Sequence, residues 1–228
     1  MLDKIHIVLV ETSHPGNIGS AARAMKTMGL KNLILVRPKK FPDQEATIMA
    51  SNADDILEQV TVVDSLDEAL ADCNLVLGTS GRDRRLPWPL ISPREAVSVI
   101  RQEAIFLEKV AIVFGNERTG LTNDELKRCH HHIHIPSNPD YCSLNLAQAV
   151  QVLAYECRIG LLEEAKIPLH QEPYANAQEV EGFYQHLEET IEALDILDRS
   201  HPKKFSLKIR RVFQRTRLTV PEINILIS

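Results

Sequence analysis

Six short apolar runs recur along the chain up to residue 135, and helical segments lie between most of them. A chain in which strands alternate with helices folds into a mostly parallel sheet that helices cover on both faces. The sequence therefore predicts an α/β fold with a parallel sheet flanked by helices. The predicted strands are Ile5–Val10, Asn32–Val36, Val60–Val63, Leu75–Gly78, Val110–Phe114 and His132–Ile135.

A turn with the sequence Gly-Asn-Glu-Arg-Thr-Gly-Leu follows one of these strands at residues 115–121. Its glycine spacing resembles a phosphate-binding loop, which ends in Gly-Lys-Ser or Gly-Lys-Thr. Here Leu121 follows the second glycine, so the lysine is missing and a nucleoside triphosphatase is disfavoured. The turn instead groups an amide, a carboxylate and a guanidinium, those of Asn116, Glu117 and Arg118. These groups belong either to a ligand site or to a surface turn with an internal ion pair.

A second polar loop, Pro-Ser-Asn-Pro-Asp-Tyr-Cys-Ser, covers residues 136–143 after the last predicted strand. We expect a long helix to begin near Ser143 and to run to about Leu162. The carboxyl ends of parallel strands meet at one edge of a sheet, where open α/β folds bind ligands. Two polar loops at that edge predict a site.

The first predicted strand leads through a Gly-containing turn into a helix over Gly16–Met28. Gly16 and Gly19 would let the backbone approach a phosphate, because free N–H groups at a helix N-terminus favour anions. Asn17 and Arg23 project from the same segment. Arg23 either reaches over the strand ends or is a solvated helix charge.

The loop after the fourth predicted strand begins with Thr79, Ser80 and Gly81, which suit backbone groups that grip a polar ligand. Three arginines follow, and arginine is well suited to phosphate recognition. A solvated, charged loop is the alternative interpretation. The three are Arg82, Arg84 and Arg85.

The C-terminal part of the chain is split by charge. Seven acidic residues and no Lys or Arg lie within Gln178–Asp198, whereas seven basic residues and no Asp or Glu lie within Lys203–Arg217. The basic segment predicts a polyanionic partner, although the net charge of the whole chain is −5. The alternative is a helical hairpin in which one helix neutralises the other. The candidate nucleic-acid contacts there are Lys208, Arg210 and Arg211.

Other features limit the class of protein. No apolar run approaches the roughly 20 residues that span a bilayer, and the N-terminus lacks the plan of a signal peptide. The four cysteines show no Cys-x-x-Cys spacing, so we expect reduced thiols and a cytoplasmic protein. His132 and His134 alternate with Ile133 and Ile135, and the histidines at 130–134 lack zinc-ligand spacing, so we predict no metal site.

Together these segments resemble the SPOUT class of S-adenosylmethionine-dependent RNA methyltransferases, in its ribose 2′-O-methylating branch. Three motifs carry the resemblance in the expected order over about residues 1–162. They are Asn17 to Arg23, the turn at residues 115–121, and Ser143-Leu144-Asn145-Leu146-Ala147. The loops and the tail are most similar to those of bacterial members that methylate cytidine or uridine 32 in the tRNA anticodon loop.

The resemblance implies a C-terminal trefoil knot and a homodimer in which Arg23 of one chain faces the methyl donor of the other. It also implies that backbone groups from three loops hold S-adenosylmethionine, without a metal. The donor-binding residues carried over are Thr79, Ser80, Gly81, Phe114, Gly115, Asn116, Ile135, Cys142, Ser143 and Leu144.

The resemblance makes Arg23 the base for ribose methylation, helped by a substrate phosphate. An equally good interpretation is that Arg23 grips that phosphate and stabilises the negative charge on the attacking oxygen, since a guanidinium keeps its proton. Glu117 would orient Arg23 or the loop. Asn17, Ser143 and Asn145 would bind the ribose or position the loops.

We predict a methyltransferase domain over residues 1–165, a linker over 166–177 and a helical C-terminal extension over 178–228. The same chemistry on ribosomal RNA remains an alternative, because the motifs do not encode which RNA is bound. A non-catalytic RNA-binding factor is another. A nicotinamide-dependent dehydrogenase is disfavoured, because no Gly-x-Gly-x-x-Gly follows the first strand.

Overall fold

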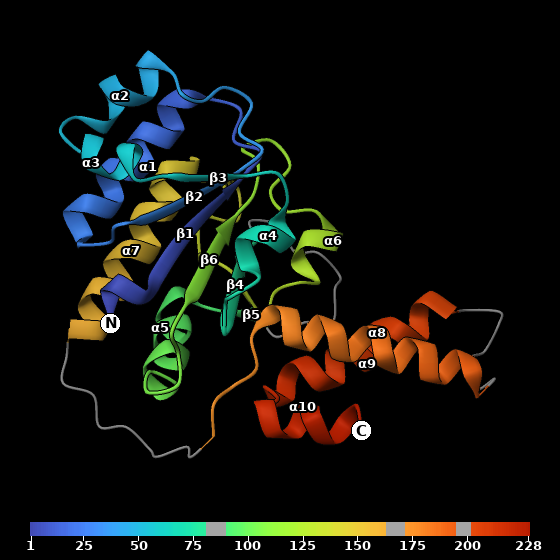
Figure 1. Ribbon diagram of the computed structural model, residues 1–228. Helices are drawn as coiled ribbons and strands as arrows, with labels where there is room; N and C mark the ends of the chain where they lie inside the picture. The colour runs from blue at the N-terminus through green and yellow to red at the C-terminus, as the bar shows by residue number, and fades with distance from the viewer. Residues whose placement is uncertain (81–89, 163–171, 195–201) are drawn as a thin grey trace.

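A computed structural model describes residues 1–80, 90–162, 172–194 and 202–228 (Figure 1). Its strands form one seven-stranded sheet in the order β3-β2-β1-β6-β4-β7-β5. Every pair of neighbouring strands is parallel, which confirms the predicted sheet type. The strands are β1 (Ile5–Val10), β2 (Asn32–Val36), β3 (Thr61–Val63), β4 (Leu75–Thr79), β5 (Leu90–Ile91), β6 (Val110–Phe114) and β7 (His131–Ile133).

The strand predictions differ from the structure by one residue at β3 and β4, and by more at two other places. The last predicted strand was placed over 132–135, whereas β7 begins at His131 and ends at Ile133. The edge strand β5 was not predicted, because two residues among prolines carry no periodic pattern.

Helices cover both faces of the sheet, as predicted. The short helices α2 and α3 were not predicted. Capping boxes at Ser92 and Thr122 begin α5 and α6. The helices of this part of the chain are α1 (Pro15–Met28), α2 (Gln44–Ala50), α3 (Asp54–Glu58), α4 (Leu66–Leu70), α5 (Pro93–Gln102), α6 (Asn123–Leu126) and α7 (Leu146–Leu162); the single-turn 3-10 helix η1 (Leu2–Lys4) precedes β1.

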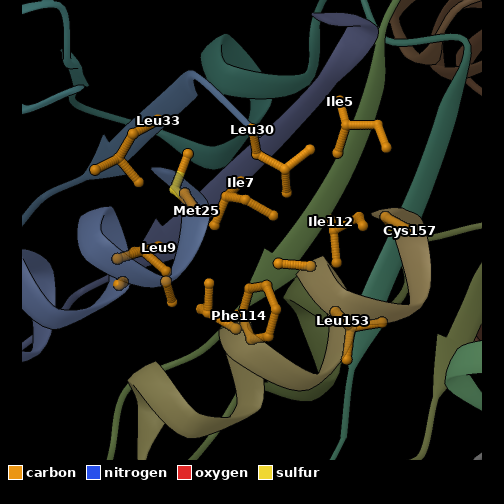
Figure 2. Close-up of a cluster of buried hydrophobic side chains, with 14 of the residues drawn as sticks. Ile5, Ile7, Leu9, Met25, Leu30, Leu33, Ile112, Phe114, Leu153 and Cys157 are labelled. Atoms are coloured by element: carbon orange, nitrogen blue, oxygen red, sulfur yellow. The ribbon is translucent and has the colours of Figure 1, made fainter. Parts of the chain in front are cut away.

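The two faces of the sheet have separate cores, because successive strand residues point to opposite sides. Ile7 and Leu9 of β1 face the larger core, which α1, α2, α3, α5 and α7 complete. Val8 and Val10 face a smaller core under α4 and α6. Figure 2 shows the larger core, where Phe114 and Leu153 pack beside Ile112.

The described residues of the acidic and basic segments form a helical tail that packs beside the sheet on the side of α4 and α6 (Figure 1). A small core built around Phe183, Tyr184 and Ile223 holds these helices together. The domain boundaries stay a prediction, and residues 163–171 of the predicted linker lie outside the described residues. The tail helices are α8 (Ala177–Ala193), α9 (Pro202–Thr216) and α10 (Val220–Leu226).

A buried arginine joins the tail to the sheet domain. The guanidinium of Arg217 lies 2.6 Å from the Glu103 carboxylate and donates to the Asn74 carbonyl at 3.0 Å. Its guanidinium carbon also lies 4.8 Å from the centre of the Tyr174 ring. Asn74 precedes β4 and Glu103 precedes β6, so the tail docks at the amino ends of the strands.

Candidate active site

A cavity of about 320 Å³ lies at the carboxyl ends of β4, β6 and β7. Apolar side chains such as Ile133 and Leu146 form part of its wall, and the strand-end loops add polar groups. Its volume falls within the range of roughly 300–1,000 Å³ that is usual for small-molecule sites. Every predicted donor-binding residue that the structure describes lines it: Thr79, Ser80, Phe114, Gly115, Asn116, Ile135, Cys142, Ser143 and Leu144.

The turn at residues 115–121 closes tightly on itself beside this cavity. The Gly120 N–H donates to the Asn116 carbonyl at 2.7 Å, and Gly120 has a φ of 65°. A Cβ on Gly115 would lie 2.1 Å from the Leu121 nitrogen, so no side chain fits there. The glycines therefore serve the closure of the turn and bring its backbone to the cavity.

The Glu117 carboxylate reaches out of this turn and binds the loop between β1 and α1. It accepts hydrogen bonds from the Ser13 N–H at 2.9 and 3.2 Å, from the His14 N–H at 3.2 Å and from the Asn17 amide at 2.9 Å. Partial burial alone would raise the pKa of Glu117. The hydrogen bonds together lower it by more than burial raises it, so the pKa of Glu117 lies below its usual value. Glu117 is therefore a stable anion that holds two loops together.

Asn145 extends this network to the third loop. Its side-chain Nδ2 donates to the side-chain Oδ1 of Asn17 at 2.9 Å, and its own side-chain Oδ1 accepts from the Ala147 N–H at 2.9 Å. Asn145 thus caps α7, which begins at Leu146 rather than near Ser143 as predicted. The side-chain amides of Asn17 and Asn145 bind each other, the Glu117 carboxylate and the start of α7. Both residues are therefore placed to position the loops.

Asn116 makes a parallel connection between the first two loops. Its amide nitrogen donates to the Glu11 carbonyl at 2.7 Å and to the Ser13 hydroxyl at 2.8 Å. Glu11 has a φ of 50°, a conformation that costs a non-glycine residue about 1–3 kcal/mol. The contact from Asn116 helps to hold this strained residue at the end of β1.

The start of α1 differs from the sequence-based expectation. A Cβ on Gly19 would lie 1.9 Å from the Ala46 carbonyl, so this glycine serves the packing of α1 against α2. The Glu45 carboxylate lies 3.5 Å from the His14 ring and next to Gly16. A negative charge at this helix end disfavours the phosphate that we expected there.

Arg23 is exposed on α1, six residues beyond Asn17. It forms no hydrogen bond or ion pair with the part of the chain that the structure describes. Its guanidinium is therefore available to an external anion.

The basic residues predicted to contact nucleic acid in the tail differ in exposure and in pairing. Arg210 is paired with Glu181 through two contacts of 2.8 Å and lies 4.4 Å from the centre of the Tyr184 ring. This arrangement agrees with the alternative of a hairpin in which one helix neutralises the other. Lys208 and Arg211 of α9 are exposed. Gly81, Arg82, Arg84 and Arg85 lie outside the described residues.

The histidines near β7 are part of the fold. His130 is buried, and its Nδ1 accepts a hydrogen bond from the Val76 N–H at 2.9 Å. Burial lowers the pKa of His131 to about 4. Among the residues that the structure describes, no His, Cys, Asp or Glu cluster has a geometry suited to a metal ion.

Two family descriptions match the chain. The SpoU rRNA Methylase family covers residues 4–155, which contain the three loops of the site. The C-terminal domain of the tRNA methyltransferase TrmJ covers residues 178–227, which contain the tail. The chain belongs to the SpoU methylase family.

Relatives of this SpoU-family chain match its sequence over nearly the full length. A Pectobacterium atrosepticum protein named tRNA (cytidine/uridine-2'-O-)-methyltransferase TrmJ is 54% identical over 229 residues, which are 99% of this chain and 95% of the relative. A Pseudomonas aeruginosa protein named tRNA (cytidine/uridine/adenosine-2'-O-)-methyltransferase TrmJ is 49% identical over 236 residues, with 99% and 92% coverage. The crystal structure of TrmJ from Z. mobilis ZM4 is 34% identical, has a TM-score of 0.83, and matches over 97% of this chain and 95% of that one.

Some residues of the site in this SpoU-family chain were not found from the sequence. Ser13 and His14 enter through backbone N–H groups, which leave no mark on residue type. Thr119 and Leu121 also line the cavity. Both residues lie within the turn at residues 115–121, and that position in the sequence could have identified them as residues of the site.

Proposed function

We propose that this chain transfers a methyl group from S-adenosylmethionine to a ribose 2′-hydroxyl of tRNA, at nucleotide 32 of the anticodon loop. The observation that supports this proposal most directly is the chain of hydrogen bonds from Asn145 through Asn17 to Glu117, beside a cavity of nucleoside size. It joins the three loops whose motifs carry the family resemblance. The names of the relatives and the matching TrmJ tail support tRNA as the substrate.

The cavity fits the proposed donor. Apolar walls from Ile133, Ile135 and Leu146 suit a flat purine, and the polar edges of Asn116 and Ser143 suit its ribose and amino-acid part. When bound, this donor supplies a methyl group on a positively charged sulfur. The residues of the chain must then hold the acceptor hydroxyl in line with it, at near-attack distance.

The hydroxyl must lose its proton as it attacks, and Glu117 is poorly suited to take that proton. Its carboxylate is occupied by donors from Ser13, His14 and Asn17, and its pKa is lowered by those hydrogen bonds although partial burial opposes this. We infer that Glu117 positions the loops. Arg23 would bind a substrate phosphate and stabilise the negative charge on the attacking oxygen, while the proton of the hydroxyl passes to bulk water and the methyl group leaves the donor sulfur.

A homodimer and a trefoil knot belong to this proposal. An exposed apolar stripe on α7 supports an interface between two copies, since Tyr155, Ile159 and Leu162 are 50%, 46% and 60% exposed. These residues recur at a spacing that places them on one helix face. In such a dimer, Arg23 of one chain would face the donor cavity of the other.

The tail would add phosphate contacts. Lys208 and Arg211 are exposed and lie three residues apart on α9, which places them on one helix face. The tail docks at the amino ends of the strands, whereas the cavity lies at their carboxyl ends. A tRNA that contacts both must therefore span the width of the domain, or use the tail of one chain and the cavity of its partner.

Ribosomal RNA is the competing substrate, because the first matching family is described by rRNA methylation. The test is incubation of the full chain with methyl-labelled S-adenosylmethionine and either unmodified tRNA or ribosomal RNA. We expect label in tRNA, as one 2′-O-methylated ribose that resists alkaline cleavage at nucleotide 32. Label in ribosomal RNA alone, or on a base, would contradict the proposal. The same mapping on tRNAs with different bases at that position would show whether adenosine is accepted.

No helix within the described ranges is both long and apolar enough to cross a membrane. We propose that the protein acts in the cytoplasm, where its tRNA substrate is found. Its four cysteines are free thiols, which agrees with a reducing compartment.

A further inference from the structure

Tyr141 presents a large aromatic ring to solvent beside the candidate active site. It is 80% exposed, and the residue that follows it, Cys142, lines the cavity. Leu144, three residues after Tyr141, lines the cavity as well. The ring is therefore accessible to a partner that approaches the candidate active site from solvent.

The backbone around Tyr141 forms a hydrogen-bonded turn. The Tyr141 N–H donates to the Asn138 carbonyl at 3.0 Å, and the Asp140 N–H donates to the Asn138 side-chain oxygen at 3.0 Å. The Ser137 hydroxyl donates to the Cys142 carbonyl at 3.2 Å. Pro139 lies within this turn and restricts its backbone further. The ring is thus carried by a defined turn, which reduces the entropy lost when it binds.

Within the described parts of the chain, the Tyr141 ring contacts no other aromatic ring. Its hydroxyl has no hydrogen-bond partner among the same residues. It does not line the cavity, although Cys142, Ser143 and Leu144 do. A ligand that fills the cavity would therefore touch the residues after Tyr141, and a second ligand arriving from solvent would meet the ring.

We propose that Tyr141 stacks on the base of the nucleotide whose ribose is methylated. This inference rests on the proposed function and adds the contact that holds the target base. Anticodon-loop bases are single-stranded, and proteins commonly hold such bases by stacking them on aromatic rings. Every base has a π face, so this contact tolerates different bases and suits an acceptor range broader than one nucleotide.

The test compares RNA binding by the wild type, Tyr141→Leu and Tyr141→Phe at one salt concentration. The RNA is an unmodified tRNA in which the wild type's target nucleotide has first been mapped. A second tRNA carries an abasic ribonucleotide at that position, which keeps the ribose and its 2′-hydroxyl. Titration with S-adenosylhomocysteine serves as the control for an intact donor site in each variant.

We expect Tyr141→Leu to weaken binding of the intact tRNA by about 5- to 150-fold, the usual effect of losing one base-aromatic stack. Tyr141→Phe keeps the ring and should bind like the wild type. The abasic tRNA should bind the wild type and Tyr141→Leu equally, because the stacking partner is already gone. S-adenosylhomocysteine affinity should stay within about twofold of the wild type's in all variants.

Three results would overturn the inference: equal binding of intact tRNA by Tyr141→Leu and the wild type, an equal loss with intact and abasic tRNA, or a loss of S-adenosylhomocysteine affinity that accounts for the RNA effect. Each leaves the proposed function standing if the wild type methylates tRNA. A wild type that methylates no tRNA ribose would instead refute the proposed function itself.

Discussion

Replacing Glu117 with glutamine tests the network that holds the three loops together. The carboxylate accepts from three donors, the N–H groups of Ser13 and His14 and the amide of Asn17, at 2.9–3.2 Å. Glutamine keeps the shape but loses the charge, and its NH2 group faces at least one of these donors. The substitution therefore weakens the contacts without opening a cavity.

The expected loss follows from the hydrogen-bond count. A hydrogen bond to a charged group contributes about 1.5–3 kcal/mol and a neutral one about 0.5–1.5 kcal/mol, so loss of the charge costs about 1 kcal/mol per donor. Because Glu117 is only half-buried, we expect about 2–3 kcal/mol in all for the three donors. If that loss appears in the transition state, kcat falls by about 30- to 150-fold.

The assay measures methyl transfer to tRNA at saturating donor, together with thermal unfolding. Glu179→Gln is the control, because Glu179 caps α8 far from the site through a single carboxylate contact with the Asn176 N–H at 2.8 Å. We expect the control to keep full activity. Unchanged kcat and unchanged stability in Glu117→Gln would refute the positioning role of the network.

The pH dependence gives an independent check on Glu117. Hydrogen bonds hold its pKa below the usual value of 4.5, although partial burial opposes them. A lowered pKa in the folded state stabilises the fold above pH 4.5, and this contribution is lost as the pH falls through the lower, folded-state pKa. The difference in unfolding temperature between the wild type and Glu117→Gln should therefore shrink below about pH 4.5.

Three further predictions concern the charges around the site and the tail. Arg23→Ala should bind S-adenosylhomocysteine like the wild type but lose methyl transfer, and full turnover would remove Arg23 from the mechanism. Glu103→Gln leaves the buried Arg217 without its charged partner and should cost about 3–5 kcal/mol in denaturant unfolding; a loss below 1 kcal/mol would contradict that. Lys208→Gln combined with Arg211→Gln should reduce the slope of log K for tRNA against log salt by about one per lost phosphate contact, and an unchanged slope would place the RNA elsewhere.

Much of the fold was readable from local patterns. Apolar runs mark strands wherever both sheet faces are buried, as for β1, and capping side chains such as Thr122 mark helix starts. The two-residue β5 and the short helix α2 depend on tertiary packing and leave no periodic pattern. The separation of acidic residues in α8 from basic residues in α9 was visible in the sequence. Only the coordinates show that Arg210 forms an ion pair with Glu181.

The candidate site was predictable as a set of loops and not as a geometry. The chain of hydrogen bonds joins residues 100 and 128 positions apart, and no spacing rule reports such contacts. Backbone donors at Ser13 and His14 carry no residue signal. The close packing of Gly19 against α2 could not be read from the sequence, because a glycine that admits a ligand and one that admits a neighbouring helix look the same there.

The most direct test of the account is a crystal structure of the chain with bound S-adenosylhomocysteine. We predict that the ligand lies in the cavity formed by Thr79–Ser80, the turn at 115–121 and Cys142–Leu144, with the Asn145–Asn17–Glu117 hydrogen bonds intact. A ligand bound on another surface, or loss of the Asn145–Asn17–Glu117 hydrogen bonds when the ligand binds, would contradict the claim that this cavity is the donor site and that the hydrogen bonds hold the loops beside it.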